Sequence, residues 1–149
     1  MVVGQVRGKK RWGATAVETA LVLIPMTFFL TGIFEYGRFL MDLNVLNNAA
    51  REGCRYALVN NTSTTISTDV TTVVTNFMAG ENNSYSGFTV TVSGTHAGVA
   101  TPVNNLVAGD LITVSVSGQY QFMNIFAPLS LPSSLTINSS VTMVCEGAT

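Results

Sequence analysis

The fold of this 149-residue chain is decided by the stretch WGATAVETALVLIPMTFFLTGIF, residues 12–34. The cations that precede it are Arg7, Lys9, Lys10 and Arg11. Between Ala14 and Phe34 the single charged residue is Glu18. A helix rises about 1.5 Å per residue, so this length matches the roughly 30 Å of a bilayer core. The pattern predicts one membrane-spanning helix over about residues 14–34.

Two residues inside this segment are unusual for a membrane helix. The carboxylate of Glu18 is costly in an apolar layer unless it is paired, which makes Glu18 a candidate functional residue. The alternative is that Glu18 lies at the level of the lipid headgroups, close to the basic leader. Pro25 has no amide hydrogen and its ring clashes with the preceding turn, so it predicts a helix kink or local unwinding.

Helical periodicity continues beyond the apolar segment. Small or apolar residues recur at spacings of three and four, with polar residues on the other faces. This stripe comprises Tyr36, Leu40, Leu43, Leu46, Ala50, Cys54 and Ala57. It predicts one helix over residues 14–58. Because no small-x-small site follows the apolar run, a secretory signal peptide is disfavoured.

The remaining residues, 59–149, predict a separate α+β head. A polar linker over residues 60–68 leads to a short amphipathic helix, for which Thr68 is the expected N-cap and Gly80 the stop. Alternation of apolar and polar residues then predicts three antiparallel strands, with a loop over residues 94–109. The strands are expected at about 88–93, 112–122 and 137–146. Such a sheet cannot cover its own apolar face, so we expect it to pack on the C-terminal half of the long helix.

Charge is distributed unevenly along the chain. All seven Lys and Arg residues lie at or before Arg55, whereas the chain from Tyr56 onward contains acidic residues and no Lys or Arg. By the positive-inside rule, the leader is expected in the cytoplasm and the head on the other side of the membrane. A head without basic residues has little to offer phosphate groups, so nucleic-acid binding is disfavoured.

The sequence gives little support for catalysis. Its one histidine, His96, falls in the expected loop without a second histidine or ligand-spaced cysteines, which disfavours a metal site. It contains no glycine loop that would cradle phosphates and no calcium-binding loop. We therefore expect no enzymatic activity, no cofactor and no small-molecule substrate.

The two cysteines are expected to meet. Cys54 lies on the apolar stripe of the long helix, and Cys145 lies on the inward-facing parity of the last strand. Two independent periodicities thus direct both sulfur atoms into one helix–sheet interface. The exported side of a membrane permits oxidation, so the sequence predicts a Cys54–Cys145 disulfide. The alternative is a pair of buried free thiols.

The connection over residues 123–135 is too apolar for an ordinary surface loop. Its large apolar residues are Ile125, Phe126, Leu129 and Leu131. They either close the bottom of the sheet or form a contact with another subunit, since exposed apolar patches often mark interfaces. Sequence alone leaves both interpretations open.

Three stretches of the chain resemble a known family. Residues 13–25, 32–38 and 47–57 are similar to the TadE-like pseudopilins of the tight-adherence (Flp) pilus system, within the type IV prepilin class. The resemblance implies that a prepilin peptidase cuts between Gly13 and Ala14 and removes the leader, residues 1–13. Glu18 then becomes the fifth residue of the mature chain. In that class, this glutamate is thought to pair with the N-terminal amine of a neighbouring subunit and to set its register.

The resemblance also implies a fold, a location and a set of partners. The fold is the lollipop of pilins, in which a partly transmembrane helix carries an α+β head. The chain would be a structural subunit, a pseudopilin or minor pilin, that spans the bacterial inner membrane and then joins a surface pilus. Its partners would be the membrane, the prepilin peptidase, other pilin subunits through the N-terminal helix, and the inner-membrane assembly platform. Two alternatives are the main subunit of a filament and a non-polymerising, membrane-anchored adhesin or envelope component.

Overall fold

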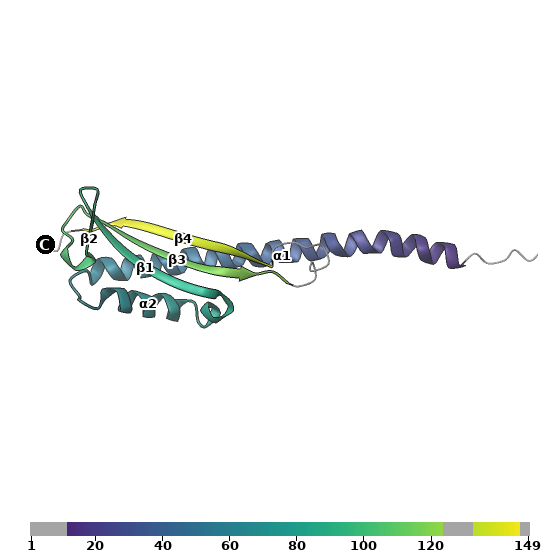
Figure 1. Cartoon of the computed structure of the whole chain (residues 1–149), viewed down its shortest axis with the longest axis horizontal. Coiled ribbons are helices and arrows are strands. Elements are labelled where there is room, and N and C mark those ends of the chain that lie inside the picture. Colours follow the sequence, from purple (N-terminus) through teal and green to yellow (C-terminus); the bar gives the residue numbers. More distant parts are fainter. Residues whose placement is uncertain (1–11, 124–132, 147–149) are drawn as a thin grey trace, which may run out of the picture. The chain divides into compact units, whose positions relative to one another are not determined.

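The computed structural model of the chain describes residues 12–123 and 133–146. Its elements are labelled in Figure 1. In chain order they are α1 (Trp12–Val59), α2 (Ile66–Phe77), the 3₁₀ turn η1 (Glu81–Ser84), β1 (Ser86–His96), β2 (Val99–Thr101), the 3₁₀ turn η2 (Val103–Asn105), β3 (Leu111–Gln121) and β4 (Ser134–Val144). They form two compact units, residues 1–37 and 38–149. The α+β class and the long N-terminal helix agree with the sequence prediction.

In the first unit, the described residues form the N-terminal part of α1. The helix continues through Pro25, and the kink expected there remains a prediction. Threonine hydroxyls after Pro25 bond to the preceding turn: Thr27 Oγ1 donates to Ile24 O at 2.8 Å, and Thr31 Oγ1 donates to Thr27 O at 2.6 Å. These bonds satisfy the hydroxyl groups within the helix itself.

The second unit contains a four-stranded antiparallel sheet in the order β2-β1-β3-β4. The prediction of three strands was wrong, because β2 lies within residues 94–109, which were expected to form a loop. The β1–β2 turn is made by Ala97 and Gly98, with φ of 49° and 83°. Two successive positive φ values suit a tight hairpin, but alanine rarely occupies such a position, so the usual Asn-Gly or Asp-Gly signal is missing.

The start of α2 also differs from its prediction. The N-cap is Thr65 and not Thr68, and the first helical residue is Ile66. Ile66 is buried, so the apolar face of the helix begins one turn before the valines from which it was predicted. Thr65 Oγ1 donates to Asp69 Oδ2 at 2.8 Å, which links the cap to the acidic residue of the first turn.

The core of the second unit lies between α2, residues 38–59 of α1 and the inner face of the sheet, as the strand pattern predicts. Gly53 marks the closest approach, because a Cβ there would lie 2.6 Å from Val74 Cγ2 and 3.4 Å from Val114 Cγ1. A polar contact joins α1 to β4: the buried Ser139 donates its hydroxyl to Asn47 Oδ1 at 2.6 Å. The largest fully buried side chains are Leu46, Cys54, Val70, Val74, Met78, Ile112, Val114, Val116 and Tyr120.

Candidate assembly site on the N-terminal helix

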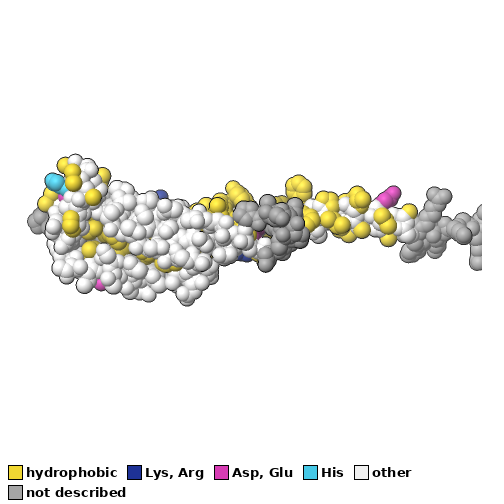
Figure 2. Space-filling model, viewed as in Figure 1, with side chains coloured by type: hydrophobic (Ala, Val, Ile, Leu, Met, Phe, Trp, Pro, Cys, Tyr) yellow, Lys and Arg dark blue, Asp and Glu magenta, His cyan; other side chains and the backbone are white. Residues whose placement is uncertain are grey.

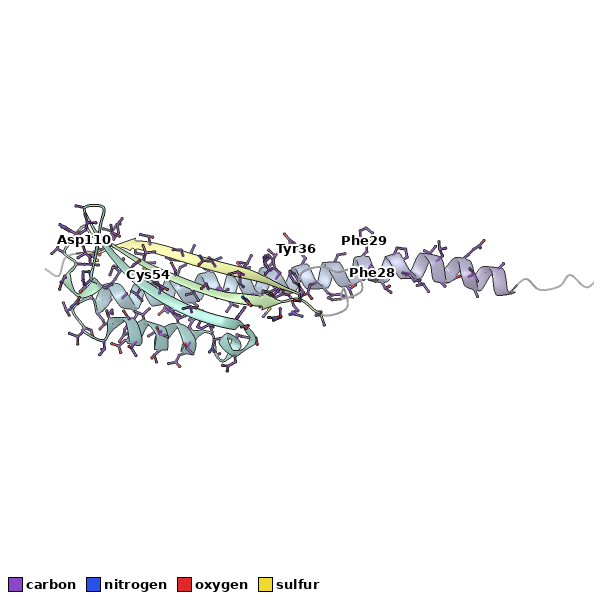
Figure 3. All side chains as sticks on the ribbon, in the orientation of Figure 1. Phe28, Phe29, Tyr36, Cys54 and Asp110 are labelled. Atoms are coloured by element: carbon purple, nitrogen blue, oxygen red, sulfur yellow. The ribbon has the colours of Figure 1, made fainter. Side chains whose placement is uncertain are left out.

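The apolar side chains of the first unit are exposed. Leu21, Phe29 and Phe34 are 71%, 77% and 74% exposed. Figure 2 shows hydrophobic side chains along this part of α1, and Figure 3 shows Phe29 pointing away from the helix. By length and composition α1 can cross a membrane. Since exposed apolar area costs about 25 cal/mol per Å² in water, this surface favours an apolar surrounding.

Glu18 lies on the exposed surface of α1, one helical turn after Ala14. Within residues 12–123 and 133–146, no hydrogen bond or ion pair includes its carboxylate. The nearby Thr19 hydroxyl bonds instead to Thr15 O, at 2.8 Å. The carboxylate is therefore available to a cation outside the described part of the chain.

Gly13 and Ala14 lie in the first turn of α1, and both are exposed. A Cβ built on Gly13 meets no described atom within 4 Å. The bond that the resemblance marks for cleavage is thus approachable as far as the described residues are concerned.

Cys54 and Cys145 are both buried in the core of the second unit. Both are free thiols in the structure, and Cys54 Sγ lies 3.5 Å from Ile112 O. Burial raises the pKa of each thiol, and the neighbouring Cys145 raises the pKa of Cys54 further. The inward direction of both side chains follows the predicted periodicities (Cys54 is labelled in Figure 3), whereas the disulfide itself remains a prediction.

The apolar loop residues Ile125, Phe126, Leu129 and Leu131 lie outside the described residues. The choice between a core role and a subunit contact therefore remains open.

One polar pair was missed by the sequence analysis. His96, expected in a loop, ends β1 and its Nδ1 lies 2.6 Å from Oδ1 of the buried Asp110. Asp110 Oδ2 also accepts the Val107 N–H at 2.8 Å, and this bond, together with His96, lowers the pKa of the carboxyl group. No local spacing rule links these residues, because the contact depends on the pairing of β1 with β3, in which Thr95 lies opposite Leu111 and His96 therefore comes beside Asp110. In the described ranges no cluster of His, Cys, Asp and Glu could hold a metal ion.

Comparison with known families identifies the N-terminal helix. The family described as TadE-like protein matches residues 13–55. This part of the chain is TadE-like. The matched range contains Gly13, Glu18, Pro25 and Cys54, and it ends before the first strand of the head. The resemblance inferred from the sequence is confirmed.

The TadE-like match indicates a component associated with a Tad pilus, a class of structural proteins. No curated protein and no solved structure matches the chain. The TadE-like region is therefore the part of the chain that connects it to a known system, and the strands of the head lie outside it.

Proposed function

We propose that this chain is a prepilin-type subunit, a pseudopilin or minor pilin, of a Tad pilus. The leader anchors the precursor on the cytoplasmic side, and α1 spans the inner membrane with the head outside. A prepilin peptidase cuts between Gly13 and Ala14, and the mature chain joins the pilus through helix–helix packing of α1.

The observation that supports this proposal most strongly is the extent of the family match. It begins at Gly13, the residue after which cleavage is proposed, and it continues through the exposed apolar segment to the buried residues Leu46, Ala50 and Cys54 of the second unit. The same residues were singled out by charge and periodicity. A helix with this exposed surface is suited to two successive environments, lipid before assembly and neighbouring helices after it.

Glu18 has a specific role in this proposal. Cleavage creates an α-ammonium group on Ala14, and both this cation and the Glu18 carboxylate are costly in an apolar layer when unpaired. Pairing Glu18 with the N-terminal amine of a neighbouring subunit removes both costs and fixes the axial register of the two helices. Pairing within one chain, at the i and i+4 positions, is the competing arrangement.

Leader cleavage is tested by Gly13→Leu. A peptidase that needs close backbone access is blocked by a bulky side chain at this position, because only glycine lacks a Cβ. We expect the variant to stay at precursor mass in the membrane fraction, as measured by intact-mass analysis. Gly8→Leu, within the leader but away from the bond, is the control and should mature normally. A mature product from Gly13→Leu would refute the proposed cleavage.

The register role is tested by Glu18→Ala. We expect normal membrane insertion, normal mature mass and a folded head, together with loss of the chain from surface fibres. Val17→Ala, at the adjacent position, is the control and should leave fibres unchanged. Normal fibres with Glu18→Ala as the sole copy would make Glu18 an interfacial carboxylate, and loss of the protein from the membrane would make its role structural within one subunit.

A further inference from the structure

The last strand of the sheet, β4, has an open edge. It pairs with β3 without a register shift from Ser134 to Val144, and no other described strand pairs with it. Proteins usually protect such edges with charged residues, proline, bulges or short strands. β4 has none of these protections: it is 11 residues long, uncharged and free of proline.

The hydrogen bonds at the two ends of β4 show which backbone groups face outward. The Cys145 N–H donates to Asp110 O at 2.7 Å, and Ser133 O accepts the Phe122 N–H at 3.0 Å, so odd-numbered residues face β3. The N–H and C=O groups of one residue point to the same side of a strand, and this side alternates from residue to residue. The outward groups therefore belong to Ser134, Thr136, Asn138, Ser140, Thr142 and Val144.

The other edge of the sheet also has an unpaired stretch, on β1. The tight turn pairs His96 with Val99, so even-numbered residues of β1 face β2. Because β2 pairs only with residues 94–96, Val90 and Val92 keep outward backbone groups. Among the described residues, no further strand covers this stretch, and residues 86–93 take part in no turn or loop backbone hydrogen bond.

The two open edges run in the same direction, since β1 and β4 are each antiparallel to β3. Residues 38–59 of α1 run this way too: Arg38 bonds to Gln121 O, opposite the start of β4, and Asn47 bonds to Ser139 further along. Two copies whose helices run the same way therefore place β4 of one parallel to β1 of the next. An antiparallel β4–β4 pair would require opposed helices.

We propose that a second copy of this chain docks on the open edge of β4, its β1 strand continuing the sheet in parallel. The uncharged edges avoid repulsion, and the exposed Glu146, which follows β4, comes to the same end as the exposed His96, which ends β1. Such a head-to-tail contact joins two different surfaces, and repeating it builds an open assembly rather than a closed dimer. The inference rests on the proposed function, because chains that span one membrane with their heads on the same side have helices that run the same way.

The test uses the full-length chain in cells that make the pilus. Ser140 is replaced by the photoreactive amino acid benzoylphenylalanine, which reports on the β4 edge. The control carries benzoylphenylalanine in place of Ser115, which lies between β1 and β4 of its own chain. We expect only the Ser140 probe to give a species of twice the chain mass, with the crosslink in residues 86–93 of the second copy. Crosslinks to β4 of a second copy or to a different protein, or no crosslink in assembled protein, would overturn the proposal.

A backbone variant gives a second test. Ser140→Pro removes an outward N–H and leaves the bonds to β3 in place, which edge strands tolerate. With the probe moved to Thr142, we expect Ser140→Pro to lose the double-mass species while the head keeps its thermal unfolding transition, and Ser140→Ala to retain the species. A double-mass species that persists in Ser140→Pro would overturn the edge pairing.

Mature mass, fibre content and the crosslinked species, measured together, distinguish this inference from the proposed function. A chain that keeps its leader or stays out of fibres, yet still gives the β4–β1 crosslink, refutes the pilus role alone. A mature chain in fibres without the crosslink refutes the edge contact alone, and loss of both results refutes both.

Discussion

At the residue scale, two buried polar side chains of the described head, Asp110 and Ser139, depend on particular partners. Asp110 is buried, and it keeps its charge through the Val107 N–H and the His96 ring. Ser139 is buried and has Asn47 as its acceptor. Glu18, in contrast, is exposed on an apolar helix, and the partner that we propose for it comes from another subunit.

The first residue-scale prediction is the Cys54–Cys145 disulfide. Both side chains are buried in one core, and oxidation would close a loop of about 90 residues, which stabilises the head by about 4 kcal/mol in the chain-entropy model. Labelling of unfolded, unreduced protein from the exported fraction should find no free thiol. Reduced protein is the control and should label at both positions. Two free thiols without reduction would contradict the bond.

The second residue-scale prediction concerns pH. The pKa of Asp110 is lowered in the folded head, so its contribution to stability is present above the ordinary Asp pKa of about 3.9 and is lost as pH falls through the lower folded value. Denaturant unfolding followed from about pH 6 to about pH 2 should show a steeper loss of stability for the wild type than for Asp110→Asn. Equal slopes would mean that the carboxylate contributes nothing specific. Glu146→Asn, an exposed acid, is the control and should behave like the wild type.

At the element scale, small residues on one face of α1 set how residues 38–59 pack within the second unit. Gly53, Ala49, Ala50 and Ala57 are buried, and they let the helix approach α2 and the sheet closely. At Gly53 an added Cβ meets Val74 Cγ2, which belongs to a stiff β-branched side chain that cannot easily move away.

The element-scale prediction is a contrast between two glycines of the same helix. Gly53→Ala should destabilise the head by about 1–3 kcal/mol, because the added methyl group overpacks the contact with α2. Gly37→Ala meets no atom within 4 Å and should be neutral or stabilise the helix by up to about 1 kcal/mol. Chemical denaturation monitored by circular dichroism measures both. A Gly53→Ala variant with unchanged stability would mean that α1 and α2 move apart to accept the methyl group without loss of stability.

At the scale of the whole molecule, the two units have different solvent requirements. All residues of the described hydrophobic core lie within residues 38–149, whereas residues 13–37 expose most of their large apolar side chains. On the face of the head that Figure 2 shows, charged side chains are few, and hydrophobic side chains form a narrow band and a group at one end among mainly polar atoms. The head is thus built for water and the N-terminal part of α1 for an apolar surrounding.

The whole-molecule prediction follows from this difference. A fragment of residues 38–149, exported to an oxidising compartment, should remain in solution without detergent and unfold cooperatively, because it keeps the complete described core. The full chain should need detergent for extraction. Differential scanning calorimetry of the fragment checks the first expectation, and a fragment that aggregates or shows no transition would mean that residues before Arg38 complete the fold.

The features that depend on local pattern could be predicted from the sequence. The α1 helix, its apolar segment, the TadE-like character of residues 13–55 and the inward direction of Cys54 and Cys145 were predicted, because helical and strand periods fix which side chains share a face. Tertiary structure decided the rest. The additional strand, β2, depends on a turn through Ala97 that pairing with β1 holds in place. The His96–Asp110 contact exists because the pairing of β1 with β3 brings together residues 14 positions apart. The open edge of β4 likewise follows from strand order, and no local propensity encodes which strand is last in a sheet.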